Sequence, residues 1–235
     1  MAKPKSSKPE KSGPGIIGTS YLLAYNGLQV VGWSYLLFQV AKHYLISGKG
    51  NDTIWNEVYY TVIVFQNAAV LEILNVALGL VKSNLMITIF QVLSRVMVVC
   101  GVLLATPTGP VSPGMPPMLF AWSVTEIIRY SYYALNIINC VPYFLVWCRY
   151  TFFIALYPIG VTGELLCFYW AQQYVAKTKA WSYELPNPLN FTFSYSYFLL
   201  SVMFSYIPLF PQMYMHMVNQ RKKIIGGQTS EKKAK

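Results

Sequence analysis

Residues 118–140 read MLFAWSVTEIIRYSYYALNIINC. This stretch has the length of a membrane-spanning helix, since ~20 apolar residues are needed to cross ~30 Å of hydrocarbon. It also carries charges near its middle, where each one costs ~2.5–3.5 kcal/mol on insertion scales. Its polar side chains follow the i, i+3, i+4, i+7 spacing of one helix face: Glu126, Arg129, Tyr130 and Tyr133. Because lipid cannot satisfy such groups, this face is predicted to point into a helix bundle.

Apolar stretches of similar length occur on both sides of this one. Together they predict an all-α, polytopic membrane bundle of six transmembrane helices, with spans near 19–41, 58–81, 84–105, 118–140, 142–175 and 191–217. The fifth stretch is too long for one upright span. Pro158 and Gly160 interrupt it, so a kink or break is expected there.

The composition agrees with a membrane protein. The chain is 55% hydrophobic and 11% charged, whereas a soluble domain has about 25% charged residues. Most of the formal net charge of +10 lies in the tails: residues 1–15 hold four lysines against one glutamate, and residues 219–235 hold six basic residues against one glutamate. Basic tails beside membrane spans are typical of cytoplasmic flanks, so nucleic acid is not expected as a partner.

These patterns divide the chain into a basic tail (1–18), a membrane domain (19–217) and a second basic tail (218–235), with both tails expected to be disordered. An even number of crossings places both tails on one side, which the positive-inside rule makes cytosolic. The ending Lys232-Lys233-Ala234-Lys235 resembles the dilysine signal of endoplasmic reticulum membrane proteins. The two Asn-x-Thr sequons, at Asn51 and Asn190, fall in loops that this topology places in the lumen.

Six ionisable side chains fall inside the expected spans, three of each sign: Glu72, Glu126, Glu164, Arg95, Arg129 and Arg149. Intramembrane charges usually face a bundle interior or a wet cavity, so they predict a polar chamber; structural ion pairs that join helices are the alternative. The arginines are candidates for contacts with phosphate or thioester oxygens, because guanidinium binds such groups in a bidentate way. Glu126 and Tyr130, on the same stripe as Arg129, are further candidates for substrate binding.

The fifth span contains the second pair of interest, Tyr157 and Glu164. Seven residues separate them, which on an unbroken helix is two turns and ~10 Å along the axis, so they share a face without touching. Between them, Gly160 and Gly163 allow another backbone or a ligand to approach closely. Taken alone, Tyr157 could be an aromatic-belt residue and Glu164 an interfacial carboxylate.

Three stretches resemble the very-long-chain (3R)-3-hydroxyacyl-CoA dehydratase family, once called protein-tyrosine-phosphatase-like. They are WSVTEIIRY from Trp122, RYTFFIALYPIGVTGELL from Arg149 and SYIPLFPQ from Ser205. The resemblance runs from about residue 19 to residue 223. It implies six membrane helices and no metal or organic cofactor. The implied reaction is removal of water from a long-chain 3-hydroxyacyl-CoA to give the trans-2-enoyl-CoA, the third step of very-long-chain fatty acid elongation. Other elongation enzymes are the implied partners.

The resemblance also implies that Tyr157 and Glu164 are the catalytic pair. Dehydration needs a base for the α-proton and an acid for the β-hydroxyl. We expect Glu164 to take the proton and Tyr157 to assist the leaving hydroxyl, although a phenolate beside Arg129 or Arg149 could exchange these roles.

The older phosphatase label is not supported by the residues themselves. The stretch that corresponds to the phosphatase motif is NVALGLVK, residues 75–82, and it contains no cysteine. A thiolate phosphatase would have no nucleophile there. With only two histidines in the chain, metal ligation is not expected either.

A non-enzymatic membrane scaffold or a transporter is the competing interpretation. In that case the intramembrane charges would serve conduction or packing. Many transporters are built from internal repeats, and no convincing repeat occurs in this sequence.

Overall fold

The computed structural model describes residues 15–233 and is helical throughout, without a strand in that range. An isolated bridge joins Tyr183 and Phe193 in the loop before the last helix. The all-α prediction is therefore confirmed. In chain order the helical segments are α1 (Ile16–Ala41), η1 (Lys42–Ile46), α2 (Asn51–Ala68), α3 (Val70–Ala77), α4 (Leu85–Val96), η2 (Met97–Leu103), α5 (Met115–Ile137), α6 (Tyr143–Arg149), α7 (Phe153–Thr178) and α8 (Tyr195–Lys233), where η marks a π-helical turn.

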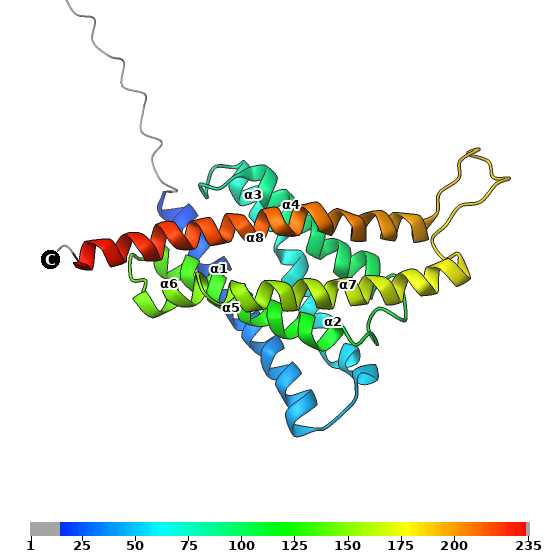
Figure 1. The fold of residues 1–235 in the computed structure, drawn as a ribbon, viewed down its shortest axis with the longest axis horizontal. Helices are drawn as coiled ribbons and strands as arrows, with labels where there is room; N and C mark the ends of the chain where they lie inside the picture. Colours follow the sequence, from blue (N-terminus) through cyan, green and yellow to red (C-terminus); the bar gives the residue numbers. More distant parts are fainter. Residues whose placement is uncertain (1–14, 234–235) are drawn as a thin grey trace, which may run out of the picture.

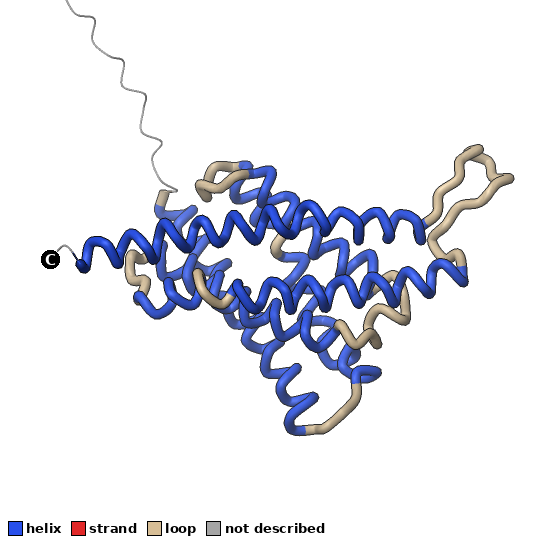
Figure 2. Tube along the Cα trace, viewed as in Figure 1, coloured by secondary structure: helices blue, strands red, loops and turns tan. Residues whose placement is uncertain are grey.

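Helix α5 lies in the middle of the bundle. It packs against α1 on one side and α7 on another, α3 contacts α4, and α8 packs along α7. Figure 1 shows α7 and α8 running along the long axis of the molecule, joined by a loop that projects at one end. The tube in Figure 2 shows that loops are confined to the connections between helices. Helix α5, which carries the polar stripe, thus lies between α1 and α7.

The interface of α1 with its neighbours is mainly apolar, and its polar side chains are hydrogen-bonded. The buried face of α1 includes Leu22, Gln29, Trp33 and Leu36, in helical spacing. The Gln29 amide donates to the Phe65 carbonyl at 3.3 Å and accepts from the Trp33 indole at 3.1 Å. These bonds satisfy an amide that lipid would leave unpaired.

The closest approach between helices is that of α5 and α7. A Cβ added at Gly163 would lie 2.7 Å from the Gly114 carbonyl oxygen and 2.8 Å from the Met118 backbone nitrogen. At Gly160, one turn earlier, an added Cβ would lie 3.5 Å from the Ala121 Cβ, which is ordinary contact. At position 163, only glycine lets the two backbones approach this closely. This contact holds the middle of α7 against α5.

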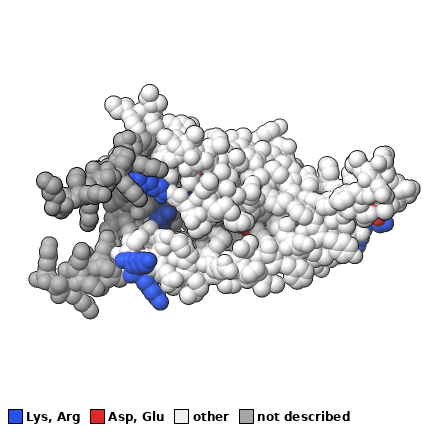
Figure 3. Space-filling model, turned by 90° about the horizontal axis from the view of Figure 1, so that it is seen from above, with Lys and Arg blue, Asp and Glu red and all other residues white. Residues whose placement is uncertain are grey.

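Within the described part of the chain, four helical stretches are long and apolar enough to cross a membrane: Thr53–Ala77, Leu85–Leu103, Phe153–Thr178 and Tyr195–Ile225. Helices α1 and α5, with 26 and 23 residues, are also long, but they carry the polar side chains that face the interior. Figure 3 shows a middle band of the surface almost free of charged residues, with Lys and Arg gathered toward the ends. This surface is suited to contact with lipid.

Several boundaries differ from the sequence-based expectation. The second span begins earlier, at Asn51, and is divided at Ala69. The fifth is divided between Arg149 and Phe153 rather than at Pro158, which lies within the continuous helix α7. A proline clashes with the carbonyl four residues earlier, here Ile154 in the first turn of α7, so its constraint falls on the start of the helix. A kink within α7 stays a prediction.

Helix α8 continues to Lys233, beyond the expected end near residue 217. Gln220, Arg221, Lys222 and Lys223 are good helix formers, and no proline follows Pro211 to stop the helix. Residues 218–233 of the predicted C-terminal tail are thus helical, so the expected disorder is not found there. Residues 1–14 and the last two residues of the dilysine ending lie outside the described residues.

Replacing Gly163 with alanine is expected to destabilise the protein. The added methyl would meet backbone atoms of α5 that cannot rotate away, and overpacking of this kind costs ~1–3 kcal/mol. The thermal unfolding midpoint of purified protein in detergent would measure the loss.

Gly160→Ala is the matched control, since the same methyl on the same helix makes only ordinary contact. Its unfolding midpoint should stay at or above that of the wild type, because alanine favours helix more than glycine. Equal midpoints for the two variants would contradict this account of the α5–α7 contact.

Candidate active site

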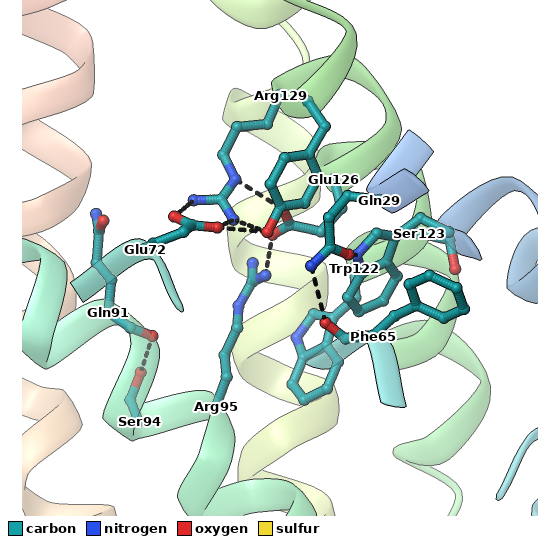
Figure 4. Close-up of polar contacts among 12 residues, drawn as sticks. Gln29, Phe65, Glu72, Gln91, Ser94, Arg95, Trp122, Ser123, Glu126 and Arg129 are labelled. Atoms are coloured by element: carbon teal, nitrogen blue, oxygen red, sulfur yellow. Dashed lines mark hydrogen bonds and ion pairs between the residues drawn. The ribbon is translucent and has the colours of Figure 1, made fainter. Parts of the chain in front are cut away.

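Glu126 of α5 lies between two arginines. Its Oε2 accepts from Arg129 Nε at 2.7 Å, and its Oε1 accepts from Arg95 Nη1, which comes from α4. The Glu126 carboxylate is 1% exposed. Figure 4 shows the two guanidinium groups converging on this carboxylate from different helices. The i, i+3 spacing seen in the sequence therefore places Glu126 and Arg129 in direct contact, as expected for one helix face.

Arg129 also forms a bidentate pair with Glu72 of α3. Its Nη1 and Nη2 donate to the two carboxylate oxygens of Glu72 at 2.9 and 2.8 Å. The Tyr130 hydroxyl, 1% exposed, donates to the same carboxylate. Glu72 was recognised in the sequence as an intramembrane charge but not as part of the site. Glu72 and Arg129 are 57 residues apart in the sequence, so no local pattern could reveal their contact.

Glu164 of α7 has different partners. Its Oε1 accepts from the Trp122 indole at 2.8 Å and its Oε2 accepts from the Tyr206 hydroxyl at 2.8 Å, with the residue 7% exposed. No ion pair to Glu164 occurs among residues 15–233. Trp122 lies one turn before Glu126 on α5, so the sequence spacing could have indicated it. Tyr206 of α8 had no such signal.

Tyr157 lies two turns before Glu164 on α7 and is half-buried. Its ring packs on Phe153 with centroids 6.1 Å apart. In the part of the chain that the structure describes, no hydrogen bond joins Tyr157 to Glu164. The structure thus places both groups on α7, the helix that packs against α5.

Arg149 ends α6 and is separate from the Glu72–Arg129–Glu126–Arg95 cluster. Its Nη2 donates to the Tyr133 hydroxyl at 3.2 Å, and the Tyr132 and Tyr133 rings lie 4.4 and 4.7 Å from its guanidinium carbon. The structure therefore brings Arg95, Arg129, Glu126 and Tyr130 together and leaves Arg149 in an aromatic environment of its own.

Within residues 15–233, no three His, Cys, Asp or Glu side chains are grouped so that they could hold a metal ion. A pocket of ≈450 Å³ lies at the end of the bundle near the α7–α8 loop. It is lined by Cys100, Leu104, Ala105, Trp181, Phe193 and Tyr195, and so by none of the candidate site residues.

The comparisons with known proteins agree on one family. Residues 66–227 match the family described as "Protein tyrosine phosphatase-like protein, PTPLA". The matched region contains all of the candidate site residues. No solved structure matches the chain significantly.

Curated relatives cover nearly the whole chain. The mouse protein "Very-long-chain (3R)-3-hydroxyacyl-CoA dehydratase 2" is 41% identical over 95% of this chain and 88% of its own length. The Caenorhabditis elegans dehydratase hpo-8 is 44% identical over 91% of this chain and 98% of its own. The Arabidopsis thaliana dehydratase PASTICCINO 2 is 32% identical over 89% and 95%. On this evidence the chain belongs to the protein tyrosine phosphatase-like (PTPLA) family, together with these dehydratases.

Proposed function

We propose that this protein is a very-long-chain (3R)-3-hydroxyacyl-CoA dehydratase, a hydro-lyase of fatty acid elongation. Relatives that carry this name match it over almost their entire length. A scaffold or a transporter is not favoured, because none of these relatives is named as one. The substrate is a long-chain 3-hydroxyacyl-CoA and the product is the trans-2-enoyl-CoA.

The observation that carries the mechanism is the distribution of counter-ions. Glu72, Glu126, Arg95 and Arg129 pair with one another, so this cluster is formally neutral. Glu164 instead receives hydrogen bonds from two neutral donors. A buried carboxylate that is oriented by neutral donors and is not held in an ion pair is available to exchange a proton with a bound substrate.

We assign Glu164 as the base and Tyr157 as the acid. Glu164 takes the proton from C2, the C2–C3 double bond forms, and the C3 hydroxyl leaves as water with the proton of the Tyr157 phenol. Return of the proton from Glu164 to the phenolate restores both groups. Because C2 and C3 are adjacent atoms, the two side chains must close on the bound substrate, and catalytic contacts commonly tighten in this way.

Four of the other candidates form the polar surroundings of this pair in our proposal. Arg95 and Arg129 converge on Glu126 of α5, the helix that packs against α7. Positive charge near the thioester oxygen would stabilise the enolate that develops when the C2 proton is removed. Glu126 and Tyr130 hold Arg95 and Arg129 in place for that role.

We propose six crossings, formed by α1, α2–α3, α4–η2, α5, α6–α7 and α8, in the endoplasmic reticulum membrane with both tails in the cytosol. Figure 1 supports an even number, because the start of α1 and the end of α8 lie toward one end of the long axis and the α7–α8 loop toward the other. The basic tails agree with a cytosolic side. Other enzymes of the elongation cycle are the proposed partners.

Tyr157→Phe and Glu164→Gln are each expected to lower kcat by about 10²–10⁴-fold, the usual contribution of a general acid or base. Both changes keep the shape of the side chain. Release of enoyl-CoA from a long (3R)-3-hydroxyacyl-CoA by purified protein measures the effect.

Tyr60→Phe is the matched control, because Tyr60 is 78% exposed and lies far from α7 in sequence. It should retain wild-type turnover. If Tyr157→Phe or Glu164→Gln stayed within a few-fold of the wild type, the assignment would fail.

The neutral cluster gives a prediction about stability. Glu126→Gln leaves Arg95 and Arg129 with the single carboxylate of Glu72. Removing one partner of a buried ion pair lowers the free energy of unfolding by ~3–5 kcal/mol. The double variant Arg95→Met with Glu126→Met keeps the bidentate Arg129–Glu72 pair. It should unfold at a higher temperature than Glu126→Gln alone; a lower midpoint would contradict the pairing described here.

A further inference from the structure

Arg149 has hydrogen-bonding capacity that the protein does not use. Its Nε and Nη1 are both buried and have no partner within residues 15–233, while its Nη2 donates to the Tyr133 hydroxyl. Arg95 and Arg129, in contrast, each donate to a carboxylate. Buried polar groups normally have hydrogen-bond partners. A guanidinium with two unpartnered nitrogens therefore indicates that an acceptor is missing.

The charge of Arg149 is also unbalanced. It makes no ion pair with any carboxylate in residues 15–233. Its neighbours are the faces of Tyr132, Tyr133 and Tyr150, at 4.4, 4.7 and 5.8 Å. Aromatic faces stabilise a cation, but by less than the cost of burying an ion. An anion would complete this site.

A second unused donor lies two residues away. The Thr151 hydroxyl is buried and has no partner. It belongs to the short break between α6 and α7, where the chain leaves helical geometry after Arg149. The end of α6 and the break that follows it thus hold, among the described residues, two unpartnered guanidinium nitrogens and one unpartnered hydroxyl. This set of donors fits the oxygens of a phosphate, which guanidinium binds with two parallel hydrogen bonds.

We infer that Arg149 and Thr151 form the subsite for a phosphate group of the coenzyme A part of the substrate. The inference rests on the proposed function and assigns a separate task to one of the three arginines. Arg149 ends α6, and Tyr157 follows eight residues later near the start of α7, beyond the break at residues 150–152. The phosphates of an acyl-CoA are separated from its thioester by the pantetheine arm. Phosphate at Arg149 and thioester at Tyr157 therefore match the order of groups in the substrate.

The test compares two thioesters of the same (3R)-3-hydroxyacyl chain, one on coenzyme A and one on pantetheine, which lacks phosphate. Full-length protein is assayed in uncharged detergent without phospholipid. For Arg149→Gln we expect KM for the CoA thioester to rise roughly tenfold to hundredfold, the usual effect of losing hydrogen bonds to a charged group. Its kcat for that substrate, and both constants for the pantetheine thioester, should match the wild type.

Thr151→Val is the milder companion variant, because it replaces the hydroxyl by a methyl of similar size. It should raise KM for the CoA thioester in the same direction by a smaller factor and leave the pantetheine thioester unaffected. Free coenzyme A should inhibit turnover of the pantetheine thioester by the wild type, and this inhibition should weaken in both variants.

Equal losses with both thioesters, or no change with either, would overturn the inference. A difference between wild type and Arg149→Gln that emerges only after phosphatidic acid is added would assign the phosphate to a lipid headgroup and equally overturn it. Turnover of the pantetheine thioester reports that a variant is folded. If the wild type dehydrated neither thioester, the proposed function itself would be wrong, which is a separate outcome.

Discussion

The structure depends on the need to neutralise charge inside a low-dielectric bundle. Glu126 of the central helix α5 accepts from Arg95 and Arg129, and Arg129 in turn binds Glu72. These contacts tie α3 and α4 to α5 through groups that could not be left unpaired in hydrocarbon. Since an uncompensated buried ion is far more costly than a lost apolar contact, the cluster determines which faces of these helices meet.

The same cluster connects to the proposed catalytic carboxylate through Trp122. The Arg95 guanidinium lies over the Trp122 ring, 5.3 Å from its centroid, and the indole nitrogen of that ring donates to Glu164. Helix α7 can bring Glu164 close enough only because Gly163 lets its backbone touch α5 at Gly114. Packing and site geometry are therefore not separable here: the glycine contact sets the distance, and the tryptophan orients the carboxylate.

The family description mentions tyrosine phosphatases, but the chemistry of this chain lies elsewhere. Residues 75–82 contain no cysteine, and of the four free cysteines Cys148 and Cys167 are buried. Buried thiols in apolar surroundings are poor nucleophiles. What α7 and α5 present instead is a carboxyl, a phenol and nearby guanidinium groups, which are the groups that acid–base elimination requires.

The sequence alone determined the all-α membrane class, the family, and the inward-facing stripe of Glu126, Arg129 and Tyr130, because helical period and hydropathy are local properties. It also identified the residues of the proposed site, through a motif that lies within one helix. It could not indicate that Glu72 pairs with Arg129, that Trp122 and Tyr206 hold Glu164, or that Arg149 has no counter-ion within residues 15–233. It also misplaced the break before α7. Pairings between helices depend on which faces come together, and that is decided only when every buried charge and close backbone contact is satisfied at once.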